Sequence, residues 1–172
     1  LKPRWFPFAM PLPGLSLIGF ARSPLVAQPF NIDADLISNY AEQRDLPALR
    51  ATSRLGVHLR FGTVSIRRVY QRVAPLSDVF VNELIWREFY QMIVWHFPHC
   101  ETRAFKPAYD RIEWLNREDD FVRWKEGQTG YPLVDAGMRQ LAATGWMHNR
   151  VRMVVASFLT KHLLVDWRWG EA

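Results

Sequence analysis

Thr144-Gly145-Trp146-Met147-His148-Asn149-Arg150-Val151-Arg152-Met153 is the stretch that decides the fold, because it joins two helical patterns through a short turn. Gly145 is placed to end the first helix. Asn149 is placed to cap the second, since an Asn side-chain oxygen can accept an unpaired N–H of the first turn. Beyond it, apolar residues recur at helical spacing, which predicts that one face packs inward. These residues are Val151, Val154, Val155, Phe158, Leu159 and Leu163.

The first turn of this second helix carries more polar chemistry than packing requires. Arg150 and Arg152 stand two residues apart, so on a helix they point about 200° from each other, at roughly 100° per residue. One guanidinium can therefore face an internal anion while the other faces solvent or a polyanion. The same residues are also compatible with a capped helix whose arginines are simply solvated.

The composition limits the class of protein. The chain has 172 residues, enough for one domain with a sizeable core. Its net charge of +5 favours a polyanionic partner without identifying one. The single cysteine, Cys100, excludes an internal disulfide framework and indicates a reducing, cytoplasmic compartment. No apolar run approaches the roughly 18 to 20 residues of a membrane span, so we expect no membrane partner.

The remaining segments give one metal candidate and several helical patterns. His96, His99 and Cys100 lie close together, but a closed zinc site needs four ligands, so we expect no metal. Residues 1–30 are rich in proline and read as an extended segment, and residues 104–120 read as a loop. Apolar spacing predicts helices over 32–44, 66–73, 82–97 and 133–143.

Two of these helices have faces that bear on function. In the helix over 32–44, the inward face is predicted to be Leu36, Ile37, Tyr40 and Ala41. In the helix over 82–97, the apolar side is predicted to be Leu84, Ile85, Phe89, Met92, Ile93 and Phe97. A second stripe on that helix, at spacings of three and four residues, consists of Glu83, Trp86, Arg87 and Tyr90.

Five stretches carry a family resemblance: residues 52–55, 82–90, 130–141, 144–153 and 156–159. Together they closely resemble the flavin-binding helical domain of the DNA photolyase and cryptochrome family, over roughly residues 31–172. The resemblance implies an all-α fold. It divides the chain into a Pro-rich interdomain linker over 1–30 and an FAD-binding helical domain over 31–172 that lacks its C-terminal part.

The resemblance also implies a role for each matching residue. FAD would be held by Tyr40, Thr52, Ser53, Arg54, Leu55, Gly56 and Arg152. Gly56 stands where the family most often has a second serine, so this position offers its backbone N–H in place of a hydroxyl. Damaged DNA would be held by Arg44, Glu83, Trp86, Arg87, Tyr90, Asn149, Arg150 and Met153. Trp114 and Trp167 match the outer and middle members of a tryptophan chain that carries electrons to oxidised flavin.

Each of these residues also has a purely structural interpretation. Thr52 and Ser53 precede a helical pattern and so suit an N-cap. Tyr40 can be a ring at the edge of the core, with Arg44 solvated beside it. Glu83 and Arg87 can form a helix salt bridge beside core aromatics.

The resemblance implies a DNA-repair enzyme that uses light and reduced FAD to split cyclobutane pyrimidine dimers by electron transfer. An antenna chromophore and a monomeric state are expected of the whole protein. The inner tryptophan and an Asp-Gly-Asp cofactor segment would lie beyond Ala172, so we expect this polypeptide alone to retain flavin poorly and to be inactive.

Two alternatives remain open. One is a cryptochrome-type photoreceptor, although Asn149 after His148, where a second His would indicate the (6-4) lesion, favours chemistry on cyclobutane dimers. The other is a non-catalytic, basic helical DNA-binding module.

Overall fold

The computed structural model describes residues 14–21 and 29–171, and over these residues it is built of helices without a strand. The predicted all-α fold is confirmed. Most of the predicted linker over 1–30 lies outside the described residues, as does Ala172. The described part of the linker is not extended throughout, because Leu15–Ile18 forms a 3-10 helix, η1, that ends at Gly19 with a positive φ of 76°.

The first group of helices has its own core. It comprises α1 (Ala34–Ser38), α2 (Tyr40–Gln43), α3 (Leu55–Arg60), α4 (Ile66–Val73) and α5 (Asp78–His96). Their shared cluster of buried side chains is Ile37, Leu55, Val69, Val73, Phe80 and Leu84. The helix predicted over 66–73 is α4, and its bounds are confirmed.

The helix predicted over 32–44 is interrupted. Asn39 separates α1 from α2 with φ −89° and ψ 3°, and its side-chain amide donates to the carbonyl of Asp35 at 2.9 Å. An Asn side chain that bonds the nearby backbone competes with continued helix, which accounts for the break. Ile37 is buried as predicted, whereas Ala41 is exposed, so the inward face ends at Tyr40.

Helix α5 starts earlier than predicted and buries less. Ser77 caps it by accepting a hydrogen bond from the Phe80 N–H at 3.3 Å, so the helix begins at Asp78 rather than Asn82. Of its predicted apolar side, Leu84 is buried and Ile93 half-buried. The prediction of an inward face is wrong for the other members, Ile85, Phe89, Met92 and Phe97, which are exposed.

The second group of helices follows two short 3-10 helices, η2 (Pro98–Glu101) and η3 (Pro107–Arg111). It comprises α6 (Glu118–Glu126), α7 (Pro132–Thr144), α8 (Asn149–Ser157), the π-helical turn η4 (Phe158–His162) and α9 (Trp167–Glu171). The segment predicted as a loop over 104–120 therefore contains η3 and the start of α6. The core of this group is Trp124, Val134, Met138, Met147, Val151, Val155, Phe158, Leu159 and Val165.

The turn between α7 and α8 forms where the sequence predicted it. Gly145 ends α7 in the left-handed conformation, with φ 67°. The cap of α8 is His148 rather than Asn149, since His148 Nδ1 accepts from the Arg150 N–H at 3.1 Å and Asn149 is the first helical residue. Because His148 Nδ1 is an acceptor, the ring hydrogen is on Nε2, which is buried without a partner among the described residues.

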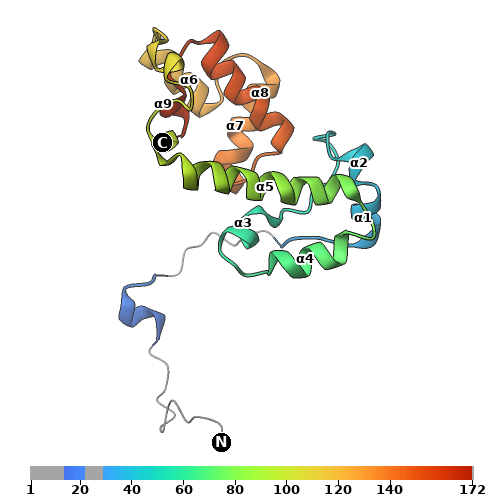
Figure 1. Ribbon diagram of the computed structural model, residues 1–172. Coiled ribbons are helices and arrows are strands. Elements are labelled where there is room, and N and C mark those ends of the chain that lie inside the picture. The colour runs from blue at the N-terminus through green and yellow to red at the C-terminus, as the bar shows by residue number, and fades with distance from the viewer. Residues whose placement is uncertain (1–13, 22–28, 172) are drawn as a thin grey trace, which may run out of the picture.

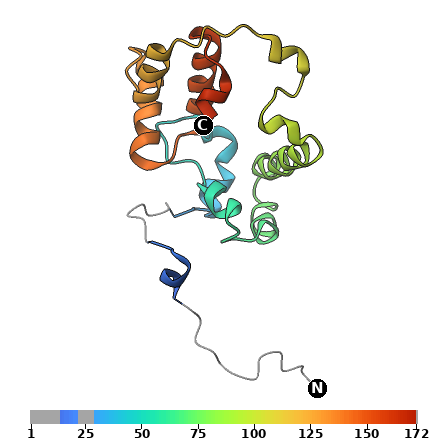
Figure 2. The ribbon, with the colours of Figure 1, turned by 90° about the vertical axis from the view of Figure 1, so that its left-hand side faces the viewer.

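Figures 1 and 2 show how the two groups are arranged. In Figure 1, α4 lies below α5, while α6 to α9 gather above α5. The quarter turn of Figure 2 keeps α4 below α5 and shows η2 and η3 in the connection from α5 to the second group. Helix α5 packs on α2 and α4, and α7 packs on both α6 and α8.

Candidate functional site

Four charged residues link α2, α5 and α8. Arg44, just after α2, forms an ion pair with Glu83 of α5 through Nη1 and Oε1. Its neighbour Asp45 pairs with Arg150 of α8, with 2.6 Å from Nη2 to Oδ2 and 3.1 Å from Nε to Oδ1. Arg44 Nε lies 3.7 Å from Asp45 Oδ1 and so joins the two pairs. We call Glu83, Arg44, Asp45 and Arg150 the ion network.

The ion network sets the charge states around it. The hydrogen bond that Arg44 donates to Glu83 raises the pKa of Arg44, so this guanidinium stays charged. The hydrogen bonds from Arg150 lower the pKa of Asp45, so this carboxylate is ionised at neutral pH. Burial, and then the nearby charge of Glu83, raise the pKa of Tyr40, so the phenol stays protonated. Two cations and two anions therefore stand next to a neutral tyrosine.

Tyr40 lies at the boundary between the ion network and the first core. Its ring meets Phe80 edge to face, with 4.8 Å between centroids. The Arg44 guanidinium lies 5.6 Å from the centre of the Tyr40 ring. Tyr40 is half-buried. This position is compatible with a ring that packs at the edge of the core and with a ring that contacts a ligand there.

An exposed aromatic surface continues along α5 from Glu83. Trp86 is 52% exposed and stacks on Tyr90, with 5.8 Å between centroids and 28° between planes. Phe89 meets the Trp86 ring edge to face at 5.5 Å. Trp86 therefore presents a flat, accessible ring one turn from the ion network.

Arg87 has different bonding partners from the other members of its predicted stripe. Its guanidinium pairs with Glu88 at 2.7 Å and donates to the Leu59 carbonyl of α3 at 3.4 Å. Arg87 thereby ties α5 to α3. The helix salt bridge expected between Glu83 and Arg87 is replaced by the separate pairs with Arg44 and Glu88.

The segment 52–56 leads into α3 through a strained residue. The N-cap of α3 is Arg54, not Thr52 or Ser53, and its side chain makes no capping hydrogen bond. Ser53 Oγ accepts from the Leu55 N–H at 3.5 Å, while the Leu55 side chain belongs to the first core. Arg54 has a left-handed backbone, with φ 56°, and its guanidinium lies 4.6 Å from the centre of the Trp146 ring. Gly56 is exposed, with open space where a Cβ would stand. The segment thus brings α3 against the turn that precedes α8.

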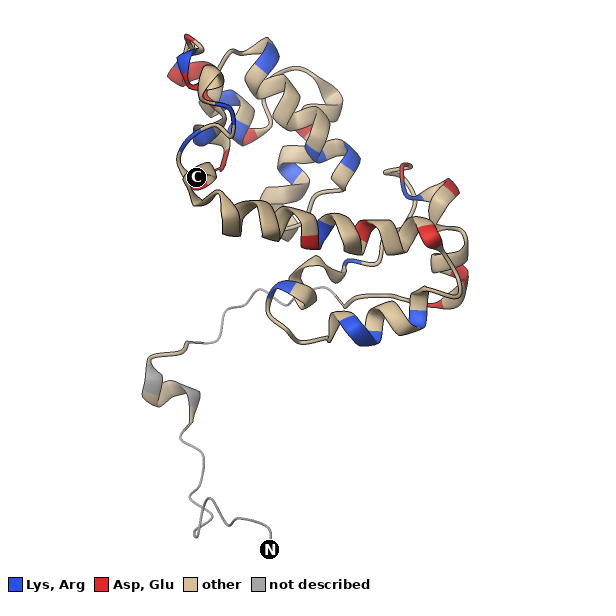
Figure 3. Ribbon diagram, in the orientation of Figure 1, with Lys and Arg blue, Asp and Glu red and all other residues tan. Residues whose placement is uncertain are grey.

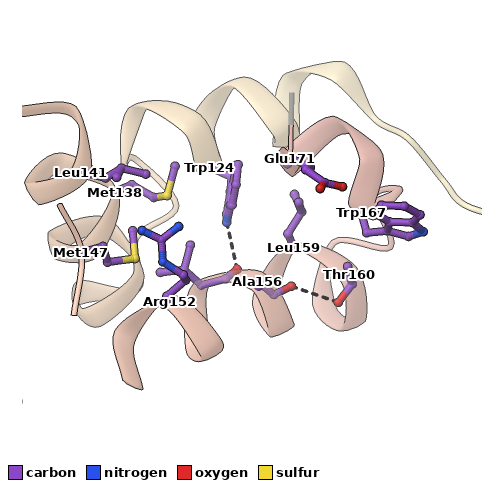
Figure 4. A pocket seen from close by; sticks show the side chains of 12 residues that line it. Trp124, Met138, Leu141, Met147, Arg152, Ala156, Leu159, Thr160, Trp167 and Glu171 are labelled. Carbon is purple, nitrogen blue, oxygen red and sulfur yellow. Dashed lines mark hydrogen bonds between the residues drawn. The ribbon is translucent and has the colours of Figure 1, made fainter. Parts of the chain in front are cut away.

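Arg152 and Trp167 line one pocket in the second group of helices, with a volume of about 290 Å³. Figure 4 shows Arg152 at the end near Met147 and Trp167 at the end near Glu171 and Thr160. Between them lies Trp124, whose indole N–H donates to the Val155 carbonyl at 3.1 Å. Arg152 forms no ion pair with any residue that the structure describes.

Trp114 lies in a segment that is bonded to the one carrying Trp167. The Leu115 N–H donates to the Leu164 carbonyl at 2.8 Å, and the Asp166 N–H donates to Asn116 Oδ1 at 2.8 Å. Arg168 reinforces this junction by donating to the Thr102 carbonyl at 3.0 Å and pairing with Asp110 at 2.7 Å. The two predicted electron carriers thus stand on adjoining segments.

Two places gather several of the predicted residues each. Arg44, Glu83 and Arg150 lie in the ion network, with Tyr40 and Trp86 beside it and Met153 Sδ 3.9 Å from Arg150 Nη1. Arg152 and Trp167 lie in the pocket, which segment 52–56 does not line. Asn149 is exposed next to Arg150. Asp45 was not predicted, although an acidic residue directly after Arg44 was a local signal for it. Trp124 was not predicted either, because its hydrogen-bond partner Val155 is distant in sequence.

With this geometry in place, comparisons with known proteins identify the family. The family model for the FAD binding domain of DNA photolyase matches residues 80–172, more than half of the chain. The chain belongs to this family. The deoxyribodipyrimidine photo-lyase of Escherichia coli is 47% identical over 142 residues, covering 77% of this chain and 30% of that protein. The enzyme of the same name from Alkalihalophilus pseudofirmus is 45% identical over 141 residues, covering 78% and 29%.

Solved structures of photolyase relatives share the fold. A class III photolyase from Agrobacterium tumefaciens gives a TM-score of 0.76 at 44% identity, covering 80% of this chain and 30% of that one. A cryptochrome from Synechocystis sp. PCC6803 gives 0.73 at 36% identity, covering 79% and 30%. This photolyase-family chain spans about 30% of the length of the relatives it matches.

Proposed function

We propose that this chain is the FAD-binding part of a deoxyribodipyrimidine photo-lyase, which uses light to split cyclobutane pyrimidine dimers in DNA. The observation that supports this best is the ion network, which draws α2, α5 and α8 together beside the exposed Trp86. Relatives of that name at 43 to 49% identity support the same reaction.

The residues proposed to hold FAD offer suitable chemistry. The Thr52 and Ser53 hydroxyls and the Arg54 guanidinium suit a pyrophosphate, since phosphates take up both hydroxyl donors and fixed cations. Leu55 and Gly56 would contribute backbone N–H groups, because the Leu55 side chain is occupied in the core. Gly56 leaves room for close approach.

Two further residues would contact the rest of the cofactor. Tyr40, with its phenol kept neutral, would contact FAD from the core edge. Arg152, without an ion-pair partner among the described residues, would place a fixed cation near the flavin ring and so favour its anionic reduced form. When FAD is bound here in its reduced form, it would supply the light-driven electron transfer for the repair.

The DNA face would use the ion network and the α5 aromatics. Trp86 would stack on the flipped dimer and Tyr90 would extend that surface, because aromatic side chains bind unstacked bases through their faces. Glu83 and Asn149 would hydrogen-bond the polar base edges, with Met153 packing beside them. The phosphate backbone would be contacted by Arg44, Arg87 and Arg150. On this proposal no side chain has to act as nucleophile or general base.

Trp114 and Trp167 would carry electrons from the surface toward oxidised flavin. Their segments are joined by the hydrogen bonds of Leu115, Asn116 and Asp166, which supports a short and fixed path. Trp167 lines the same pocket as Arg152.

The setting of the proposed enzyme is a reducing cytoplasm, where a monomer acts on damaged DNA with an antenna chromophore as second pigment. The family and the single cysteine support this setting. None of the described helices combines the length and the apolarity needed to cross a bilayer. Figure 3 shows basic segments along α4, where the exposed residues Arg67, Arg68 and Arg72 add positive charge suited to DNA.

The decisive test is lesion recognition by the Trp86→Ala variant. Fluorescence anisotropy is measured with two duplexes that differ by one cyclobutane thymine dimer. Loss of base stacking, worth roughly 1–3 kcal/mol per base, should lower the affinity for the dimer duplex about tenfold or more while leaving the undamaged duplex within twofold.

Trp95→Ala is the matched control for this test. Trp95 is 83% exposed and stands nine residues further along α5, about 900° or half a turn out of phase, on the opposite face. It should bind both duplexes as the parent does. Equal affinity of the parent for both duplexes, or equal effects of the two substitutions, would contradict the repair function.

A photoreceptor is the second candidate, and the likeness to a cryptochrome at TM-score 0.73 favours it. The same measurement separates it from repair. A photoreceptor or a plain DNA-binding module would show no preference for the dimer duplex, and Trp86→Ala would then change only stability.

A further inference from the structure

Both arginines of the ion network are already neutralised by carboxylates. Arg44 pairs with Glu83, which has a proposed role at the lesion. Arg150 pairs with Asp45, for which the proposed function has no use. Asp45 is therefore the one member of the ion network whose presence needs a separate explanation.

The geometry of the Asp45–Arg150 pair is that of an arginine holding a phosphate. Two N–H groups, on Nε and Nη2, face two oxygens at 3.1 and 2.6 Å. A guanidinium fork binds carboxylate and phosphate in this same two-pronged way, so the two anions compete for it. The third nitrogen, Nη1, lies 3.9 Å from Met153 Sδ.

The pair is also within reach of a polyanion. The Asp45 side chain is 50% exposed and that of Arg150 is 44% exposed. Asp45 follows the charged Arg44, and Arg150 follows the exposed Asn149. The Nε–Nη2 edge of the Arg150 guanidinium therefore becomes available to a phosphate only when the Asp45 carboxylate leaves it.

We propose that Asp45 is a specificity-determining residue that occupies the place of a DNA phosphate on Arg150 and must be displaced when DNA binds. This inference rests on the proposed function of the DNA face. Exchanging one anion for another yields little net pairing energy, and the released carboxylate repels the neighbouring phosphate. The affinity for every duplex is thereby lowered. The preference for damaged DNA then depends on contacts available only at a lesion, such as stacking on Trp86.

The test compares Asp45→Asn with a charge-matched control in the full chain. Glu42→Gln removes one exposed acid from α2, three residues away, for which the described residues offer no ion-pair partner. Binding of an undamaged duplex is followed by fluorescence anisotropy between about 50 and 200 mM salt. Asp45→Asn should tighten binding about three- to tenfold and steepen the salt slope by up to about 0.9, because no released carboxylate then offsets the phosphate contact of Arg150. Glu42→Gln should change affinity less than twofold.

A double-mutant cycle with Arg150→Gln shows whether Asp45 acts through Arg150. The gain from Asp45→Asn should vanish when Arg150 is already Gln. A gain that persists in that background, or that equals the gain of Glu42→Gln, would overturn the proposal. If Asp45→Asn does not fold by circular dichroism, Asp45→Ser takes its place in the same cycle.

The outcome is separable from that of the proposed function. The repair reading fails if the parent protein shows no preference for a dimer duplex. The Asp45 proposal is decided on undamaged duplex alone, so either can fail while the other stands.

Discussion

Helices α5 and α8 share a pattern of apolar residues in sequence but differ in how much of that pattern is buried. Each carries apolar residues at helical spacing. In α8 the predicted face is largely buried, with Val151 and Val155 in the second core, but the prediction is wrong for Val154, which is exposed. In α5 Leu84 is buried, while its neighbour Ile85 is 58% exposed. Apolar spacing thus predicts that a helix forms, whereas burial depends on whether another element is shaped to receive it.

The partner of α8 has such a shape. Gly137 of α7 faces α8 so closely that an added Cβ would lie 2.6 Å from Val151 Cγ1 and 3.1 Å from Val155 Cγ2. The absence of a side chain lets the two helices approach. Helix α5 packs on α2 and α4, while several of its apolar side chains, among them Ile85, Phe89 and Met92, stay exposed.

The largest expected effect comes from the difference in burial between Leu84 and Ile85, which are neighbours on α5. Leu84→Ala should lower the free energy of unfolding by about 2–4 kcal/mol, because it empties part of the first core. Ile85→Ala should change it by less than about 0.5 kcal/mol, as expected at an exposed site. Urea denaturation of both variants measures this, and equal losses would show that α5 is covered on both sides in solution.

The next effect concerns the close approach of α7 and α8. Gly137→Ala should destabilise by about 1–3 kcal/mol, because the valines it meets are β-branched and cannot turn aside easily. Gly56→Ala is the control, since nothing lies within 4 Å of its added Cβ. It should be neutral, or stabilising by up to about 1 kcal/mol. If Gly137→Ala leaves the free energy of unfolding unchanged, α7 and α8 can move apart without loss of stability.

A pH-dependent effect tests how α7 is anchored at its start. Asp135 accepts from the Thr129 N–H at 2.8 Å, the Thr129 hydroxyl at 2.6 Å and the Gly130 N–H at 3.0 Å, and these bonds lower its pKa. A lowered pKa in the folded state stabilises the fold above the unfolded pKa, and that stabilisation is lost as pH falls through the folded pKa.

Urea midpoints of the parent and of Asp135→Asn, measured from pH 7 down to pH 3, check this prediction. The parent should be the more stable at pH 7, and the two curves should converge in the acid range. A constant difference across the range would rule out the carboxylate as the anchor.

The smallest effect is expected at the most exposed ring of α5. Trp95→Ala should leave the free energy of unfolding within about 0.5 kcal/mol of the parent, because its ring has little packing to lose. Thermal unfolding by circular dichroism measures it. A large loss of unfolding free energy would show that the Trp95 ring is packed in an interface. The difference in burial between α5 and α8 would then be smaller than the structure indicates.

The features that could be predicted from sequence depend on nearby residues. Helix α4 and the turn at Gly145 follow from local spacing and from the ease with which glycine adopts a positive φ. The break at Asn39 was missed because the competing bond to the Asp35 carbonyl is not apparent from apolar spacing. The cap at His148 was missed because Asn is the commoner capping residue.

In the candidate site, too, some features could be predicted from sequence and others could not. The family resemblance implies site residues such as Tyr40, Trp86 and Arg150, and their roles remain proposals. The pairing of Arg150 with Asp45, 105 positions away in the chain, was not predicted. Nor was the placement of Arg152 and Trp167 around one pocket.

By itself the sequence determined the helical class, the family and the turn that joins α7 to α8, because these depend on short runs of residues and their local conformational preferences. Only the tertiary structure decided which faces are buried and which charges are paired. Those outcomes depend on contacts between segments far apart in the chain, where a carboxylate such as Asp45 selects its partner by distance and geometry rather than by position in sequence.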